Sequence, residues 1–139
     1  MVALARHTAS SVGLSLTAYL DQAVAADPRL SPPAETVAAL AAAAVRISRL
    51  IAHGPLTSLM GAGALGETTG AANADGDVQK ALDLQANEIV LAALHDAPVA
   101  YFASEEEDAI LTLAAEAEAP DQLVAVAVDP LDGSSNIDV

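Results

Sequence analysis

The stretch Leu123-Val-Ala-Val-Ala-Val-Asp-Pro-Leu-Asp132 says most about how this chain folds. Its first six residues are apolar without a break, which is typical of a buried β-strand. Two carboxylates, Asp129 and Asp132, follow the apolar run directly, and at the end of a strand they can point into one small volume. The sequence therefore predicts a strand that ends in an acidic turn.

The residues after this turn are donors. Gly133 allows the backbone to bend sharply, and Ser134 and Ser135 offer hydroxyl and backbone N–H groups. Carboxylates beside a group of donors form a place where hard metal ions can meet a phosphate. The chain ends at Val139, one residue beyond the motif, so we expect the other half of such a site to lie outside it.

Composition limits the possible functions. The chain has 139 residues, enough for one domain with a core, but with one Phe, two Tyr and no Trp that core must rest on Leu, Val, Ile and Ala. The net charge of −14 disfavours nucleic acid and anionic membranes as partners. The absence of cysteine excludes disulfides and thiol catalysis. Neither a membrane span nor a secretory signal is recognisable, which favours a cytoplasmic protein.

Two helices are predicted in the first half of the chain, after a loose N-terminus over residues 1–14. The first begins after Ser15 as N-cap and ends at Asp27-Pro28. The second begins at Ser31-Pro32-Pro33, because proline suits a first helical turn. Its apolar stripe is expected at Val37, Leu40, Ala44, Ile47 and Ile51, and its C-terminus near Arg46, Arg49 and His53, where positive charge is favoured.

The second half begins with a glycine-rich loop over residues 54–76, which hold six of the eight glycines. A third helix is predicted from Asp77 or Lys80 to about His95, with its buried side marked by Leu82, Ile89 and Leu94. Three short strands are predicted after it, at Val99–Phe102, Ala109–Leu113 and Leu123–Val128.

Further acidic groups stand beside the terminal motif. The run Ser104-Glu-Glu-Glu-Asp108 follows a predicted strand directly, and ligand sites gather at strand ends in layered α/β folds. Such a run is more often a solvated surface, and Glu105 and Glu106 share a site only if the chain bends there. Asp77 and Asp83 can likewise be ordinary helix charges. The histidines at 7, 53 and 95 share no ligand spacing, so we interpret them as structural or surface residues.

Three motifs taken together resemble one family. Gly76-Asp-x-x-Lys-x-x-Asp83, Ser104-Glu-Glu106 and Asp129-Pro-Leu-Asp-Gly-Ser-Ser-Asn-Ile-Asp138 stand in the order and at the separations of class I fructose-1,6-bisphosphatases. The wider inositol-monophosphatase superfamily shares Asp-Pro-x-Asp-Gly but generally continues with Thr-x-Asn. The resemblance implies an α/β fold, a layered α+β sandwich with N-terminal helices 1 and 2 packed on a mixed sheet, in which residues 15–139 are the N-terminal part of the enzyme domain.

The resemblance also assigns roles, residue by residue. Metal ligands for Mg²⁺, or alternatively Mn²⁺, are implied at Glu105, Glu106, Asp129, Asp132 and the carbonyl of Leu131. Glu106 and Asp83 resemble the pair that activates the attacking water, and Asp77 resembles a residue of a mobile loop that supports the metals. Asp132, Gly133, Ser134 and Ser135 resemble the residues that bind the 1-phosphate of the sugar.

The implied activity is hydrolysis of fructose 1,6-bisphosphate by a cytoplasmic homo-oligomer, a tetramer by resemblance, with this chain inactive alone. Sedoheptulose 1,7-bisphosphate remains open as a substrate, as do a dual enzyme and a gluconeogenic or Calvin-cycle role. A non-catalytic metal-binding or assembly module is the alternative from another class. Regulated relatives carry a Gly- and Thr-rich AMP-binding stretch where this chain has Asp27-Pro-Arg-Leu-Ser-Pro-Pro33, so AMP inhibition is not expected.

Overall fold

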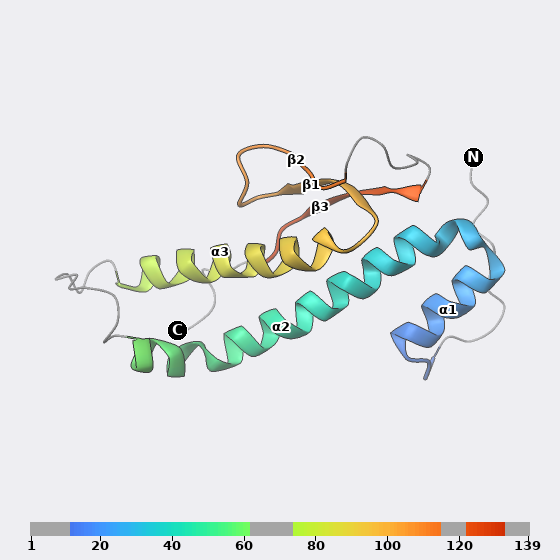
Figure 1. The fold of residues 1–139 in the computed structure, drawn as a ribbon. Helices are drawn as coiled ribbons and strands as arrows, with labels where there is room; N and C mark the ends of the chain where they lie inside the picture. Colours follow the sequence, from blue (N-terminus) through green and yellow to red (C-terminus); the bar gives the residue numbers. More distant parts are fainter. Residues whose placement is uncertain (1–11, 62–73, 115–121, 133–139) are drawn as a thin grey trace.

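A helical layer lies against one face of a small mixed sheet (Figure 1). This arrangement is seen in a computed structural model that describes residues 12–61, 74–114 and 122–132, with the backbone only for 53–61 and 74–81. The layered α/β class expected from the sequence is confirmed. No helix within the described ranges is long and apolar enough to cross a lipid bilayer.

The first helix, α1, spans Leu16–Ala26 as the sequence predicts. Ser15 is its N-cap, and the Ser15 hydroxyl accepts a hydrogen bond of 3.2 Å from the backbone N–H of Ala18. The chain leaves the helix at Asp27 and forms a short 3₁₀ segment, η1, over Pro28–Leu30. The predicted start and end of α1 are therefore both confirmed.

The second helix, α2, begins at Ser31 and runs to Gly61, further than the sequence indicated. Two predictions are wrong here: residues 54–61 continue the helix instead of forming a loop, and Arg46 and Arg49 lie in its middle. Glycine at 54 and 61 is tolerated because the helix is otherwise rich in alanine and leucine, which favour helix strongly. The remainder of the predicted loop, 62–73, lies outside the described residues.

The buried stripe of α2 also differs from the prediction. Ile47 is buried and Leu40 and Ile51 are half-buried, but Val37 and Ala44 are exposed. The core position one turn before Ile47 belongs to Ala43, which is 1% exposed. The small side chain of alanine lets α2 and α3 pack closely at this position. An alanine in an alanine-rich helix gives no signal in the sequence that marks it as a core position.

The third helix, α3, spans Ala74–His95, so the last residues of the predicted loop, 74–76, are helical. Leu82 and Leu94 are buried and Ile89 packs against the core, so its predicted apolar side is confirmed. His95 is exposed in the last turn, where the helix dipole favours a basic group.

Three strands form the sheet in the order β2-β1-β3. The strand β1 is Val99–Ser104, β2 is Leu111–Thr112 and β3 is Val124–Val128. The pair β1 and β2 is antiparallel, and the pair β1 and β3 is parallel. All three strands fall within or beside their predicted ranges, although β2 is shorter than expected.

An irregularity in β1 decides which of its side chains are buried. Val99 and Phe102 would face opposite sides of a regular strand, yet they are 1% and 0% exposed. The register with β3 shifts between Val99 and Tyr101, and this bulge turns both apolar side chains to the helices. Tyr101 faces away from the helices and is 53% exposed.

The core lies between α2, α3 and β1. Its buried members are Ala43, Ile47, Ala86, Val90, Leu94, Val99 and Phe102. Helices α2 and α3 lie side by side and touch the sheet, whereas α1 packs against α2 and η1 (Figure 1). The sequence predicted that helices 1 and 2 pack on the sheet, but the helices that do so are α2 and α3. Helix α3 takes this place because it leads directly into β1.

Candidate functional site

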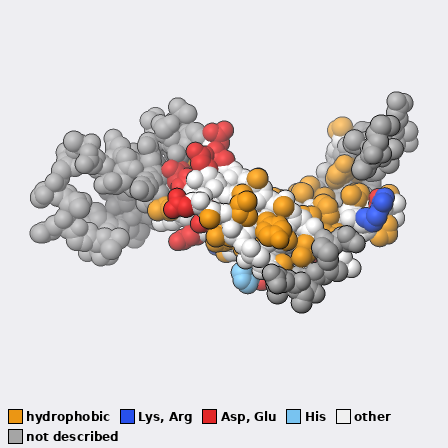
Figure 2. Space-filling model, turned by 90° about the horizontal axis from the view of Figure 1, so that it is seen from above, with side chains coloured by type: hydrophobic (Ala, Val, Ile, Leu, Met, Phe, Trp, Pro, Cys, Tyr) orange, Lys and Arg blue, Asp and Glu red, His pale blue; other side chains and the backbone are white. Residues whose placement is uncertain are grey.

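The carboxyl ends of two neighbouring parallel strands bring the acidic motifs together. Ser104 and Val128 are paired at the ends of β1 and β3, so the residues that follow them, Glu105 and Asp129, leave the sheet side by side. Acidic side chains gather at this end of the molecule, next to the hydrophobic ones that lie over the sheet (Figure 2). We call Glu105, Glu106, Asp129 and Asp132 the acidic edge.

The chain bends directly after β1, as a shared site of Glu105 and Glu106 requires. The N–H of Glu105 donates to the carbonyl of Val128 over 3.4 Å, which keeps it beside β3. The N–H of Glu106 then donates to the Ser104 hydroxyl over 3.3 Å, and the N–H of Glu107 to the Ser104 carbonyl over 3.3 Å. Ser104 thus stabilises a turn that carries the side chains of Glu105 and Glu106.

A second turn follows β3. The Asp129 carboxylate accepts a hydrogen bond of 3.2 Å from the backbone N–H of Leu131, which closes an Asx-type turn. The Leu131 side chain packs against the core, and Asp129 and Asp132 are exposed on either side of it. The apolar contact thereby fixes where the two carboxylates lie.

The carboxylates of the acidic edge are close enough to influence one another. Asp129 raises the pKa of Glu105, first by its negative charge and then by a hydrogen bond between the two side chains. Glu106 and Asp132 raise the pKa of Glu105 further by their charge. Like charges held together without a counterion favour the protonated form, and a bound cation would relieve that repulsion.

Helix α3 is joined to the turn after β1 through Asn87, for which the sequence predicted no role. The side-chain amide of Asn87 donates a hydrogen bond of 2.7 Å to the carboxylate of Glu107. Asp83, which was predicted to activate water, is half-buried one helical turn earlier on the same face of α3. A polar residue inside the apolar side of a predicted helix is the signal that could have revealed Asn87.

The remaining predicted residues lie partly outside the description. The backbone of Asp77 belongs to the first turns of α3, but its side chain is not described. Gly133, Ser134 and Ser135, predicted to bind phosphate, lie outside the described residues. The structure therefore brings together the predicted metal ligands and leaves the predicted phosphate donors untested.

The chemistry of the acidic edge fits a hard divalent cation. Its side chains offer only carboxylate oxygens, and their mutual repulsion favours a positive ion between them. Within the described ranges, however, no three Asp, Glu or His side chains already stand in a metal-binding arrangement. The argument that the acidic edge suits a divalent cation therefore depends on its carboxylate oxygens and on the repulsion between their charges.

A hollow that reaches the acidic edge at Asp129 does not suit a sugar phosphate. It has a volume of about 440 Å³ and lies between α2, Val90 and the end of β3. Asp129 and Ser48 are its polar side chains, and the others are apolar. A phosphorylated sugar held at the acidic edge would need donors from elsewhere.

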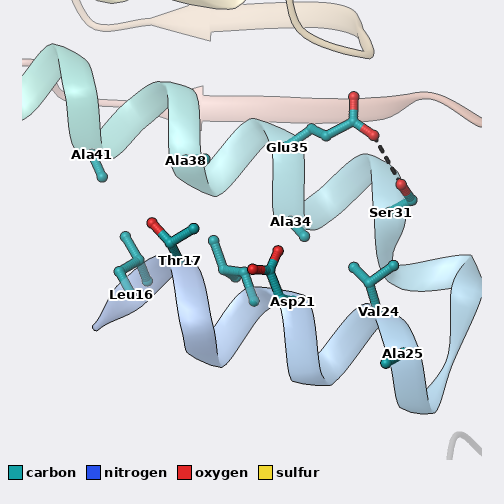
Figure 3. A pocket seen from close by; sticks show the side chains of 11 residues that line it. Leu16, Thr17, Asp21, Val24, Ala25, Ser31, Ala34, Glu35, Ala38 and Ala41 are labelled. Atoms are coloured by element: carbon teal, nitrogen blue, oxygen red, sulfur yellow. Dashed lines mark hydrogen bonds between the residues drawn. The ribbon is translucent and has the colours of Figure 1, made fainter. Parts of the chain in front are cut away.

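A second groove, of about 540 Å³, separates α1 from α2 (Figure 3). Leu16, Val24 and several alanines line it, together with the carboxylates of Asp21 and Glu35. The Glu35 carboxylate accepts a hydrogen bond of 2.8 Å from the Ser31 hydroxyl. No lysine or arginine is among the described residues that line this groove, so their electrostatics disfavour an anion.

Comparison with known families and proteins gives one consistent result. Residues 32–139 match the sequence profile described as "Fructose-1-6-bisphosphatase, N-terminal domain". The chain is similar to "Fructose-1,6-bisphosphatase class 1" of Methylorubrum extorquens (strain PA1), with 48% identity over 127 residues that cover 91% of this chain and 33% of the relative.

Two further relatives agree. The protein of the same name from Methylobacterium radiotolerans is 48% identical over 130 residues, which cover 94% of this chain and 34% of the relative. The one from Rhodopseudomonas palustris (strain BisB5) is 47% identical over 126 residues, 91% of this chain and 33% of the relative. The chain thus spans about a third of the length of the curated relatives it matches. No solved structure matches it.

Proposed function

Because this chain belongs to the fructose-1-6-bisphosphatase family, we propose that the full-length protein hydrolyses the 1-phosphate of fructose 1,6-bisphosphate, yielding fructose 6-phosphate and phosphate. We propose further that it works in the cytoplasm as a homo-oligomer. The short chain by itself is proposed to be inactive, because its relatives extend over about three times its length. Membership of the family supports the class of reaction. The support for metal binding and water activation comes from the acidic edge.

One observation carries the proposal: Glu105 and Asp129, from two different motifs, meet at the ends of β1 and β3. Their carboxylates are close enough for the negative charge of Asp129 to raise the pKa of Glu105. An ordinary solvated acid run has no reason to join a second acidic segment 24 residues away in the sequence. The convergence favours a cation site over a surface charge run.

The residues proposed to hold Mg²⁺ or Mn²⁺ are Glu105, Glu106, Asp129 and Asp132, with the carbonyl of Leu131. Bound cations would neutralise the charge of the phosphoryl group and of the departing sugar oxygen. Gly133, Ser134 and Ser135 are proposed to hold the 1-phosphate with their N–H and hydroxyl donors, with Asp132 beside them. Phosphoryl transfer depends mainly on such positioning and charge neutralisation.

The carboxylates also supply a base. Glu106 and Asp83 are proposed to orient the attacking water and to accept its proton while its oxygen bonds to phosphorus and the bond to the sugar oxygen breaks. Glu106 follows β1, and Asp83 lies on the face of α3 that reaches the same turn through Asn87. Asp77 is proposed to support the cations from the start of that helix.

Phosphate release from fructose 1,6-bisphosphate tests the proposal. The full-length protein is expected to turn over the substrate with Mg²⁺ and to lose activity in EDTA, and the 139-residue chain is expected to show no turnover. Sedoheptulose 1,7-bisphosphate, assayed in parallel, decides between a single and a dual enzyme. Lack of release from either sugar by the full-length protein would leave the non-catalytic metal-binding or assembly module as the better interpretation.

A further inference from the structure

The strongest unassigned feature is a hydrogen bond between α3 and the turn after β1. Asn87 Nδ2 donates to Glu107 Oε1 over 2.7 Å, between residues 20 apart in the sequence. A hydrogen bond to a carboxylate at this distance is of the short, charge-assisted kind. It ties the turn that carries Glu105 and Glu106 to the helix that carries Asp83.

The position of Asn87 is costly for the fold. The side chain is 5% exposed and lies between the core residues Ala86 and Val90 on α3. Its Oδ1 atom is buried and has no hydrogen-bond partner within the described part of the chain. Burying such an acceptor carries a desolvation penalty that an apolar side chain would avoid, so the bond to Glu107 must supply something else.

The hydrogen bond determines which end of the amide points to the turn. Glu107 as a carboxylate only accepts, so the NH₂ group of Asn87 must face it and the amide oxygen must face away. Reversing the amide would set two acceptors against each other. The pair is therefore a directional link, and a carboxylate at position 87 could not replace the amide without changing residue 107.

Residue 107 is joined to the acidic edge by a hydrogen-bonded turn. Its N–H donates to the Ser104 carbonyl, and the N–H of Glu106 donates to the Ser104 hydroxyl. With Glu107 tied to α3 and Ser104 paired with β3, both ends of the turn are held. Asp83 lies one helical turn from Asn87, about 6 Å along the axis, so the same link sets its distance from Glu106.

We propose that Asn87 is a positioning residue, which acts through Glu107 to hold Glu105 and Glu106 in register with Asp129 and Asp83. This inference rests on the proposed function and assigns roles to two residues outside the predicted metal and phosphate sites. Asn87 and Glu107 touch neither substrate nor metal in this role. Their effect is on the affinity of the acidic edge for a divalent cation.

The test exchanges donor and acceptor in the full-length protein. Asn87→Asp removes the donor and sets a carboxylate against Glu107, whereas Glu107→Ala removes the acceptor from the more exposed side. Glu107→Gln keeps an acceptor oxygen, and the double variant Asn87→Asp with Glu107→Gln rebuilds the bond with its direction reversed. Glu88→Ala, on the exposed side of α3, is the matched control for loss of an acid.

Two readouts are measured on each variant: the Kd for Mn²⁺ by electron paramagnetic resonance, and the kcat and KM for fructose 1,6-bisphosphate. Asn87→Asp and Glu107→Ala are expected to weaken Mn²⁺ binding and lower kcat by about 10–100-fold, as for other partners of metal ligands. KM should change much less, because the turn does not hold the sugar. Glu107→Gln and the double variant should recover most of the loss.

The outcomes separate this inference from the proposed function. Normal Mn²⁺ affinity in Asn87→Asp and Glu107→Ala, or a double variant as impaired as Asn87→Asp although folded by its thermal midpoint, would overturn the positioning role. Wild-type protein that binds Mn²⁺ but releases no phosphate would overturn the function alone, since the Mn²⁺ Kd still decides the role of Asn87. Wild-type protein that binds no Mn²⁺ overturns both.

Discussion

The interface between the helices and the sheet differs in kind from the acidic edge only a few residues away. Val99 and Phe102 in β1 are almost completely buried against α2 and α3, and the next residues along the chain, from Glu105 on, carry charges toward solvent. The apolar side chains of the interface bury one another. The acidic edge has no such match, because its neighbouring carboxylates repel one another and raise the pKa of Glu105.

This contrast separates the part of the chain that is complete by itself from the part that depends on added counterions and donors. Apolar burial is non-directional and is complete as soon as two layers meet. A group of carboxylates is complete only when counterions and donors arrive from elsewhere. Stability should therefore be most sensitive to changes at the interface, and activity to changes at the acidic edge.

Glu106→Gln in the full-length protein should have the largest effect on activity. Glutamine keeps the size of the side chain but loses the charge and the ability to accept a proton. General base catalysis contributes roughly 10²–10⁴-fold, so kcat should fall by about that range while KM changes little. Steady-state kinetics at saturating Mg²⁺ measures this, since excess metal offsets a simple loss of affinity.

The control for this change is Glu88→Gln, which removes one negative charge from the exposed face of α3. It should leave kcat close to the wild-type value. If Glu106→Gln retained kcat within about threefold of wild type, well short of the general-base range, Glu106 would belong to a solvated acid run instead of the site.

Phe102→Ala should have the largest effect on stability. Phe102 is fully buried between the helices and the sheet, so the substitution leaves a cavity as well as losing apolar contacts. The free energy of unfolding should fall by about 3–5 kcal/mol, as measured by urea denaturation of the full-length protein. A loss below about 1 kcal/mol, the scale of one or two methylene groups, would mean that this interface is not the main core.

Glu105→Gln should stabilise the fold in the absence of metal, because it removes one of the carboxylates that repel one another at the acidic edge. The raised pKa of Glu105 means that the folded chain holds this proton more tightly than the unfolded chain, so ionisation destabilises the fold as pH rises through that pKa. In EDTA at neutral pH the variant should therefore have a higher thermal midpoint than wild type. At a pH well below the ordinary carboxyl pKa, the difference should vanish.

Adding Mg²⁺ should give the wild type the higher thermal midpoint of the two proteins. A bound cation stabilises the wild type more than a variant that lacks one ligand. Thermal scans with and without Mg²⁺ measure both signs. A wild type that is more stable than Glu105→Gln even in EDTA would contradict the repulsion inferred between Glu105 and Asp129.

The smallest expected effect is that of AMP: it should not inhibit the full-length protein through the groove between α1 and α2. Asp21 and Glu35 line this groove, no lysine or arginine is among its described lining residues, and Arg29 is paired with Asp27 at 2.7 Å. A phosphate there would meet net negative charge. An AMP titration of the full-length protein tests this, and strong inhibition that substitutions at 29–34 abolish would refute it.

Much of the local structure followed from the sequence alone. Ser15 and Asp27 bound α1, and the proline pair after Ser31 opens α2, because caps and prolines act through neighbouring backbone groups. The strand before Asp129 could be located from its unbroken apolar run. The acidic residues of the motifs could also be identified directly, since they are recognised by residue type and spacing.

Which residues come into contact across the fold could not be predicted from the sequence. The bulge that buries both Val99 and Phe102, the pairing of β1 with β3 that sets Glu105 beside Asp129, and the bond from Asn87 to Glu107 all join residues distant in sequence or displaced from regular alternation. Periodicity reports the environment of a residue within its own helix or strand. It carries no record of which strand lies next to it, and so the acidic edge exists only once the sheet has formed.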